Sequence, residues 1–297
     1  MTRHRSSLSV DTTMADTSLS TAEFVRPCPL CNSPRSHADQ RRGTVTLRRC
    51  DDCSMVFSAS GEVPTDMYEA AFADEGHRYH QYAHEAERVA SGKHHVAWGW
   101  RQFFKRTTPL PADRTLLDIG CSTGVFLSEA RRRGWDRITG NELSPSAAEW
   151  ARKLVGCAVY EELIEQAPIA PESFSAITVW EVIEHVPDPQ GFVRRIRELL
   201  KPGGVVAITT PNWESRWERA TTDFFRMPPY HLSYWTPPTL SRLLSDAGFT
   251  DIQTARKPFA WTEELGPSAP LQLPVSIFRS SVLGQKGNRM FAFARRK

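Results

Sequence analysis

The chain has 297 residues, 40% of them hydrophobic and 24% charged, and a formal net charge of +3. This length holds one large core, or one domain of about 200 residues with a small module beside it. The charge is too small to indicate a strongly basic nucleic-acid surface. No apolar run reaches the roughly 20 residues that a membrane helix needs.

The first 24 residues are polar and rich in Ser and Thr. They contain no continuous apolar segment of the kind that a secretory signal carries. We therefore predict a disordered tail over residues 1–24. With no secretion signal and no membrane span in the pattern, we expect a cytoplasmic protein without a membrane partner.

Four cysteines follow the tail in the pattern C-x2-C-x18-C-x2-C. Two such pairs can place four thiolates around one Zn²⁺ ion in a tetrahedral site. Free thiols are the alternative, as are disulfides if the compartment is oxidising. Four cysteines leave no coordination position open, so we predict a structural zinc ion that stabilises a small ribbon module over residues 25–60. Its ligands would be Cys28, Cys31, Cys50 and Cys53.

Residues 61–111 are rich in aromatic and histidine side chains. We expect a mostly helical cap here, packed beside a pocket. His77, His80 and His84 are spaced so that they can share one helical face, which raises a metal site as an alternative to simple packing.

From residue 112 to 297 the pattern alternates between short apolar runs and amphipathic segments. We expect strands at 114–120, 137–142, 157–162, 175–181, 205–211, 251–257 and 289–296. Between them, Ser144, Asp188 and Thr236 are each followed by proline, the order that a helix N-terminus favours. The glycines at 203–204 would end the helix that begins after Asp188. Such alternation predicts an α/β fold with a doubly wound, mostly parallel sheet.

The stretch DIGCSTG, residues 118–124, follows the first of these strands. In doubly wound sheets, ligands bind beyond the carboxyl ends of the strands, next to this position. Gly120 and Gly124 allow the backbone to turn tightly and to lie close to a ligand. Glu142 ends the second strand, where a carboxylate can accept both hydroxyls of a ribose.

The ligand of this loop is not expected to be a dinucleotide or a nucleoside triphosphate. The loop has the pattern G-x-x-x-G rather than G-x-G-x-x-G, and no Gly-Lys-Ser/Thr follows it. A nucleoside with a ribose, a positive sulfonium and no phosphate suits the site better. That ligand is S-adenosylmethionine.

Several motifs in this half of the chain resemble those of one family. LLDIGCSTGVFL, the acid in GNELS, VWEVIEHVPDP and LKPGGVVAITTPN are similar, in order and spacing, to the motifs of class I S-adenosylmethionine-dependent methyltransferases. The resemblance covers residues 114–255 and implies a seven-stranded, Rossmann-like sheet. The front half is similar to bacterial members with a cysteine-pair zinc module.

The resemblance also implies which residues bind the methyl donor. Gly120 and Gly124 would line its methionine part, and Glu142 would bind its ribose. Many relatives place an acid near the adenine, where this chain has Leu163 and Ile164, so the adenine contact is left open. The residues expected to bind the donor are Asp118, Gly120, Cys121, Ser122, Gly124, Glu142, Leu143, Ile164, Trp180 and Glu181.

WEVIEH places Glu181, Glu184 and His185 at positions i, i+3 and i+4, which share one face if a helical turn begins there. The motif resembles that of the ubiquinone-biosynthesis O-methyltransferases, in which the matching residues can hold a divalent cation. The resemblance therefore implies Mg²⁺ here, which would acidify a bound hydroxyl. The alternative is that the glutamates favour a helix N-terminus and that His185 bonds the following loop.

His231 lies in MPPYHLSYW, after the fifth strand, where relatives place substrate residues. A histidine with a pKa near neutrality can take a proton from an attacking hydroxyl. Tyr230, Tyr234 and Trp235 would form an aromatic wall around it. We therefore name His231 and His185 as catalytic candidates, with a loop-anchoring role for His231 as the alternative.

The most favoured function at this stage is methyl transfer to a small molecule, directed to a hydroxyl, in specialised or cell-envelope metabolism. An RNA methyltransferase that grips nucleic acid with its zinc ribbon is the alternative, and a non-catalytic cofactor-binding protein is the third. The ribbon carries Asp51 and Asp52 beside Arg48 and Arg49, which argues against a nucleic-acid partner. The proline-rich segment 257–288 would be a lid or an interface.

Overall fold

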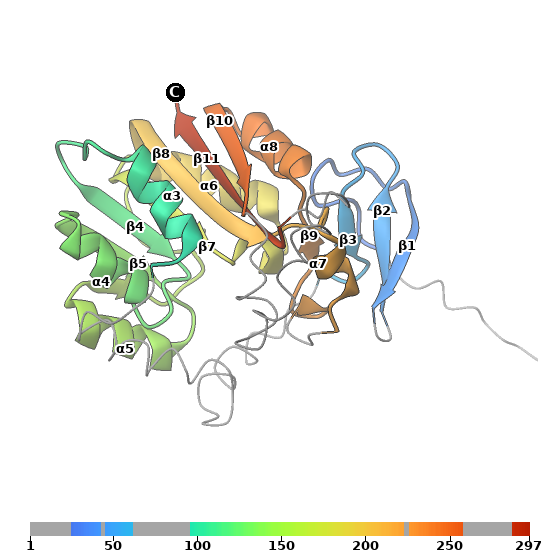
Figure 1. Ribbon diagram of the computed structural model, residues 1–297, viewed down its shortest axis with the longest axis horizontal. Coiled ribbons are helices and arrows are strands. Elements are labelled where there is room, and N and C mark those ends of the chain that lie inside the picture. The colour runs from blue at the N-terminus through green and yellow to red at the C-terminus, as the bar shows by residue number, and fades with distance from the viewer. Residues whose placement is uncertain (1–24, 43–44, 62–95, 223–225, 258–286) are drawn as a thin grey trace, which may run out of the picture.

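The computed structural model describes residues 25–42, 45–61, 96–222, 226–257 and 287–297 (Figure 1). The expected tail over 1–24 lies outside these residues. So do most of the expected cap, with all five of its histidines, and most of the segment 257–288. The boundaries that we expect between tail, module, cap and methyltransferase domain stay predictions.

A seven-stranded sheet forms the centre of the protein, as the alternating pattern predicts (Figure 1). The strand order is β10-β11-β8-β7-β4-β5-β6. The pairs from β8 to β6 are parallel, while β11 is antiparallel to both of its neighbours. The strands are β4 (Thr115–Ile119), β5 (Arg137–Asn141), β6 (Ala158–Tyr160), β7 (Phe174–Trp180), β8 (Leu200–Pro211), β10 (Phe249–Arg256) and β11 (Arg289–Arg296).

Helices cover both faces of this sheet, so it is doubly wound. Apolar side chains of α3 (Trp98–Arg106), α4 (Val125–Arg132) and α5 (Pro145–Val155) pack on one face. Those of α6 (Pro189–Leu199) and α8 (Pro237–Asp246) pack on the other. Burial of these apolar stripes is the main favourable term that holds the three layers together.

Side-chain caps define the starts of three helices at the predicted residues. Ser144 Oγ accepts from the Ala147 amide, Asp188 Oδ1 from the Gly191 amide and Thr236 Oγ1 from the Thr239 amide. Each bond satisfies a backbone donor that has no partner inside the helix. The predicted end of α6 is wrong, however. Helix α6 ends at Leu199, and Gly203 and Gly204 lie within β8, since the chain turns directly into that strand.

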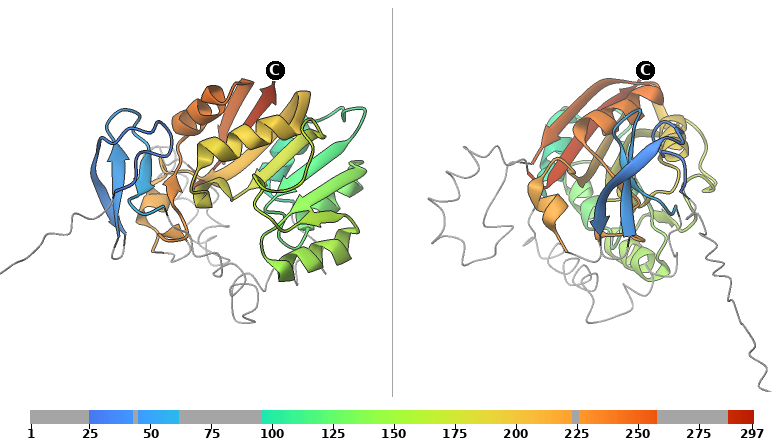
Figure 2. Two further views of the ribbon diagram at one scale, coloured as in Figure 1. Left: turned by 180° about the vertical axis from the view of Figure 1, so that it is seen from behind. Right: turned by 90° about the vertical axis from the view of Figure 1, so that its right-hand side faces the viewer.

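The N-terminal module is a small antiparallel sheet of β1 (Ser36–Arg42), β2 (Val45–Cys50) and β3 (Val56–Ser58). Its fourth strand is β9 (Ser233–Tyr234), which comes from the far end of the chain. Both views in Figure 2 show the module beside the segment that carries β9 and the short helix α7 (Arg216–Ala220). The module is therefore joined to the rest of the chain by backbone pairing with β9 as well as by side-chain contacts.

None of the helices among the described residues is both long enough and apolar enough to cross a membrane.

Candidate active site

Asp118 and the two glycines lie at the carboxyl end of β4. Asp118 is buried and accepts a hydrogen bond of 2.7 Å from Thr178 Oγ1 on the neighbouring strand β7. Burial raises the pKa of this carboxyl well above its usual range. Gly120 and Gly124 have φ angles of +72° and +82°, a backbone region that residues other than glycine rarely adopt.

Both glycines also allow close packing behind the loop. A Cβ at Gly120 would clash with the side chain of Val182, and one at Gly124 would lie 2.9 Å from Val155 Cγ2 and 3.0 Å from Ala151 Cα. The turn is thus held tightly between η1 (Ile183–His185) and α5, which fixes where its backbone amides point.

Glu142 directly follows β5 and binds the loop after β4. Its Oε2 accepts from the Ser122 amide at 2.8 Å, and its Oε1 accepts from the Ser144 amide at 2.9 Å. Ser122 has a positive φ of 50°, a strained conformation that such sites often contain. The carboxylate is therefore held in one orientation at the carboxyl edge of the sheet, next to Asp118 and the glycine loop.

The remaining residues expected at the donor site differ in their exposure to solvent. Leu143 is 39% exposed, and so is open to a ligand, whereas Ile164 is packed in the core beneath α6. Leu163, which precedes Ile164 and is not among the residues expected to bind the donor, is 47% exposed. Trp180 ends β7 and packs against Phe126 with 5.0 Å between ring centroids.

Cys121 and Ser122 lie in the glycine loop itself. The Cys121 thiol is buried, and its pKa is raised, first by burial and then by the charge of Glu142. Ser122 Oγ and the indole nitrogen of Trp180 are buried with no hydrogen-bond partner among the described residues. Buried polar atoms without a partner are rare, and a bound ligand is one way to satisfy them.

A second cluster forms where β7 and β8 end. His185 Nδ1 lies 2.8 Å from the Tyr230 carbonyl oxygen, and its ring meets that of His231 edge-on, with 4.8 Å between centroids. Glu184 Oε2 accepts from Thr210 Oγ1 at 2.9 Å, and the Glu184 carbonyl accepts from the Leu232 amide at 2.8 Å. Both histidines are catalytic candidates from their sequence motifs, and the structure brings their rings into contact.

The electrostatics of this cluster keep it close to neutral. Burial raises the pKa of Glu184 and lowers that of both histidines, and the neighbouring His185 lowers the pKa of His231 further. Because a carbonyl only accepts, Nδ1 of a neutral His185 carries the proton. Its Nε2 is then a proton acceptor.

The predicted helical face of Glu181, Glu184 and His185 does not form. Only one 3₁₀ turn, η1, follows β7, and Glu181 precedes it with a positive φ of 55°. The Glu181 carboxylate instead accepts from Arg289 Nε at 2.8 Å. The expected Mg²⁺ ligands are therefore not brought together. The ligand-type atoms that do lie within 4.8 Å of one another belong to Glu184, His185 and His231.

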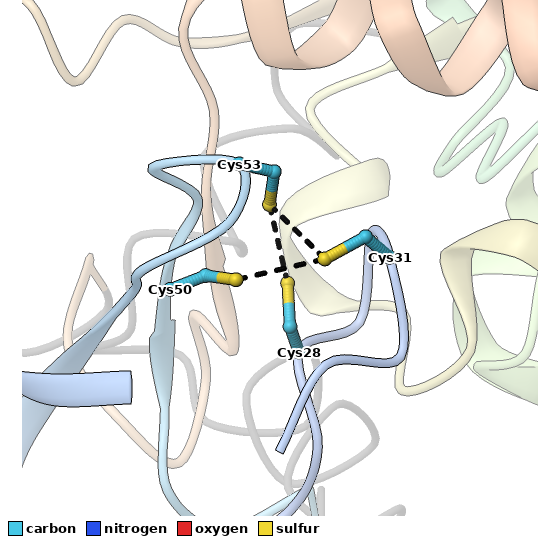
Figure 3. Close-up of side chains that lie close together, drawn as sticks. All are labelled: Cys28, Cys31, Cys50 and Cys53. Atoms are coloured by element: carbon cyan, nitrogen blue, oxygen red, sulfur yellow. Dashed lines mark hydrogen bonds between the residues drawn. The ribbon is translucent and has the colours of Figure 1, made fainter. Parts of the chain in front are cut away.

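The four cysteines of the module converge as their spacing predicts (Figure 3). Sγ–Sγ distances of 3.5 Å join Cys28 to Cys53, Cys31 to Cys50 and Cys31 to Cys53. Four sulfurs around zinc at about 2.3 Å would be about 3.8 Å apart, so the donor set fits this ion. None of these cysteines forms a disulfide.

The thiol chemistry agrees with that fit. A hydrogen bond from Cys53 lowers the pKa of Cys28 to about 5, and the same contact raises the pKa of Cys53. Without a cation, the cluster therefore favours one thiolate over four. A bound dication would compensate the charge that the other thiolates add.

Comparison with known proteins agrees with this fold. Residues 82–254 match a family model described as a methyltransferase domain, which is more than half of the chain. The chain belongs to this methyltransferase family. Its class of fold is shared by a solved methyltransferase of Archaeoglobus fulgidus, with a TM-score of 0.52 and 16% identity over 66% of this chain and 92% of that one.

A phosphoethanolamine N-methyltransferase of Haemonchus contortus, solved in complex with S-adenosyl-L-methionine, also shares the fold. Its TM-score is 0.58, with 18% identity over 81% of this chain and 61% of that one. Among curated proteins, the ubiquinone biosynthesis O-methyltransferases of Ralstonia nicotianae and Serratia proteamaculans are 40% and 36% identical over 114 and 106 residues. These matches cover 36% and 34% of this chain. The chain spans about half the length of these relatives, 47% and 44%.

Proposed function

We propose that the protein transfers the methyl group of S-adenosylmethionine to a hydroxyl group of a small-molecule acceptor. One observation carries the donor assignment. The Glu142 carboxylate is held by two backbone amides beside the glycine loop, at the carboxyl edge of two adjacent parallel strands. A carboxylate in this place suits the two hydroxyls of a ribose.

The acceptor assignment draws on two further observations. Relatives that match part of the chain are named O-methyltransferases, which favours a hydroxyl as the nucleophile. Burial lowers the pKa of both His185 and His231, which favours neutral rings, and the pair follows β7 and β8, which are adjacent parallel strands. A neutral imidazole at this edge of the sheet can take the proton that the hydroxyl loses.

In this mechanism the donor, when bound, supplies a methyl group that its sulfonium already activates. The chain's own residues bind the donor and orient it toward the acceptor. Glu142 would hold the ribose, and the turn at Gly120 and Gly124 would admit the methionine part. The Tyr230 carbonyl fixes the tautomer of His185, whose ring contacts that of His231, and His231 would receive the proton. Alignment of two reactants can lower a barrier by about 7–11 kcal/mol at the upper end.

The zinc ion is assigned a structural role. Cys28, Cys31, Cys50 and Cys53 would hold it, and with four thiolates no position is left for a substrate. The ion would cross-link the turn before β1 to the turn between β2 and β3. This module is too small to bury a sufficient core alone.

Charge pairing in the module disfavours the RNA alternative. Arg35 pairs with Asp52, His37 with Asp51, and Arg49 with Asp39. The acidic partners offset the charge of these basic side chains, so the module offers a poor surface for phosphates. An affinity for RNA that falls steeply with salt would support the alternative.

The test is transfer itself. Purified protein is incubated with isotopically labelled S-adenosylmethionine and extracts of the producing organism, and the labelled product is identified by mass spectrometry. We expect a small molecule with a new O-methyl group, and about 50-fold less product with Glu142→Ala at donor concentrations near the wild-type Kd. Calorimetry of folded, ligand-free protein that shows no heat with S-adenosylmethionine or S-adenosylhomocysteine would refute the proposal.

His231→Ala separates the two sides of the site. We expect donor affinity within about twofold of wild type, with a turnover that is about 100-fold slower, in the range that a lost general base gives. If His231→Ala and Glu142→Ala lose donor affinity equally, the division of roles is wrong.

A further inference from the structure

The module and the segment that carries His231 share a backbone connection. Val56 pairs with Tyr234 and Phe57 with Ser233, and the Ser58 amide donates to the Leu232 carbonyl at 2.9 Å. Leu232 directly follows His231. The edge strand of the module is therefore bonded to the segment that carries one of the two histidines.

One side chain of the module extends this connection to both histidines. Arg26 Nη2 donates to the Leu232 carbonyl at 2.8 Å, and Nη1 donates to the Pro187 carbonyl at 3.1 Å. Its Nε donates to the Ser58 carbonyl of the module itself at 3.0 Å. Leu232 is one residue after His231, and Pro187 is two residues after His185. A single planar guanidinium thus spans the two segments on which the histidines lie.

The position of Arg26 is itself tied to the cysteine cluster. The Arg26 amide donates to the Ala59 carbonyl at 3.0 Å, and Cys28 follows two residues later. A metal ion bound by the four thiolates would fix the chain at Cys28 and hence the register of Arg26 against β3. Without that cross-link, the segment before Cys28 is held by the hydrogen bonds of Arg26 itself, to the carbonyls of Ala59, Ser58, Pro187 and Leu232.

We propose that Arg26 is a positioning residue that sets the contact between His185 and His231, and that the four-cysteine site acts on this histidine pair through it. This inference rests on the proposed function only where it calls the histidine pair the acceptor side of the site. The module is then part of the catalytic framework rather than a separate binding domain.

A different contact of the module provides a matched control. Gln190 Nε2, near the start of α6, donates to the Pro29 carbonyl and to Asn32 Oδ1, both at 3.2 Å. This contact also joins the module to the large domain, but neither histidine segment takes part in it. Loss of the Gln190 contact should loosen docking without a direct effect on the histidine pair.

The experiment observes the histidine rings directly in the full chain. Histidine is labelled with ¹³C at Cε1, and ¹H–¹³C spectra are recorded at one fixed pH. The variants His185→Gln and His231→Gln assign the two cross-peaks. Because the rings meet edge-on at 4.8 Å, each ring current should shift the cross-peak of the other away from the position of an exposed histidine.

We expect Arg26→Ala to reduce these shifts by at least about half, while zinc stays at about one ion per chain and the Kd for S-adenosylmethionine stays within about twofold. Gln190→Ala should leave both cross-peaks in place. Removal of zinc from the wild type with a chelator should move the cross-peaks as Arg26→Ala does. If Arg26→Ala releases zinc, Arg26→Lys takes its place, with the same reduction of the shifts expected at unchanged zinc content and donor affinity. Lysine keeps the positive charge, but its single ammonium group cannot span the three carbonyls.

Unchanged cross-peaks in a zinc-loaded Arg26 variant would overturn the proposal, as would equal shifts in Gln190→Ala. Loss of zinc, donor affinity and ring shifts together in Arg26→Lys would also overturn it, since that result indicates a purely structural residue. Failure of the proposed function would look different: the wild type would give no heat with S-adenosylmethionine, while the spectra would still report on Arg26.

Discussion

Substitution of Glu142 by alanine tests the donor site most directly. In the structure the two carboxylate oxygens accept from the amides of Ser122 and Ser144 and so fix the loop after β4. In the proposed complex the same carboxylate accepts the two ribose hydroxyls. Alanine removes all of these acceptors at once, and the loop loses the group that orients it.

The magnitude follows from the number of bonds. A hydrogen bond to a charged group contributes about 1.5–3 kcal/mol, so two lost ribose bonds weaken binding by about 3 kcal/mol at the low end. Since about 1.4 kcal/mol corresponds to a factor of ten, we expect a Kd that is about 100-fold weaker.

The assay is isothermal calorimetry with S-adenosylmethionine and, separately, S-adenosylhomocysteine. Both ligands contain the ribose, so both should lose affinity by the same factor, whereas a residue that acts on the sulfonium charge would separate them. Glu149→Ala is the matched control, because Glu149 lies on α5 and forms an ion pair with Lys153 at the surface. A change of less than about threefold, or a loss confined to S-adenosylmethionine, would refute the reasoning.

Three further predictions address the loop, the buried carboxyl and the zinc site. Gly120→Ala should destabilise the fold by about 1–3 kcal/mol more than Gly156→Ala in urea unfolding, because both positions have a positive φ but only the Cβ at 120 meets Val182; equal losses would contradict the packing argument. Burial raises the pKa of Asp118, so above about pH 4 the folded chain keeps a proton that the unfolded chain releases, and stability is lost as the pH rises toward the folded pKa. Melting curves of Asp118→Asn should therefore lack part of the decline that the wild type shows as the pH rises above about 4, and identical profiles would exclude this effect. Cys53→Ser should lower bound zinc from about one ion per chain to nearly none by atomic absorption, and full retention of zinc would disprove the four-thiolate site.

The helix starts and the strands of the large sheet were predictable because their signals are local. Ser144 before Pro145, and Thr236 before Pro237, each combine a side-chain acceptor with a residue whose φ already suits a helix. Apolar runs that end in turn residues likewise marked the buried strands. The cysteine pairs were equally informative, because their spacing leaves few arrangements other than one shared cluster.

Errors arose where the outcome depends on distant residues. The spacing of Glu181, Glu184 and His185 suits a helical face, but Glu181 has a positive φ and accepts a hydrogen bond from Arg289, which begins β11 and lies 108 residues later. Two residues of strand β9 carry no periodicity at all, so its pairing with the module could not be read from the pattern. By contrast, the meeting of His185 and His231 was within reach, because these residues follow β7 and β8, which are adjacent parallel strands.

Leu47 and Val56 of the module lie against Trp213 and Tyr234 of the large domain in one small apolar cluster. Each partner supplies half of it, and β9 supplies the strand that completes the module's sheet. A shortened protein that begins after the module would therefore carry an uncovered pair of aromatic rings and an unpaired strand edge on its surface. Such a surface attracts other copies of itself, and the α/β half should consequently aggregate when it is produced without its first sixty or so residues.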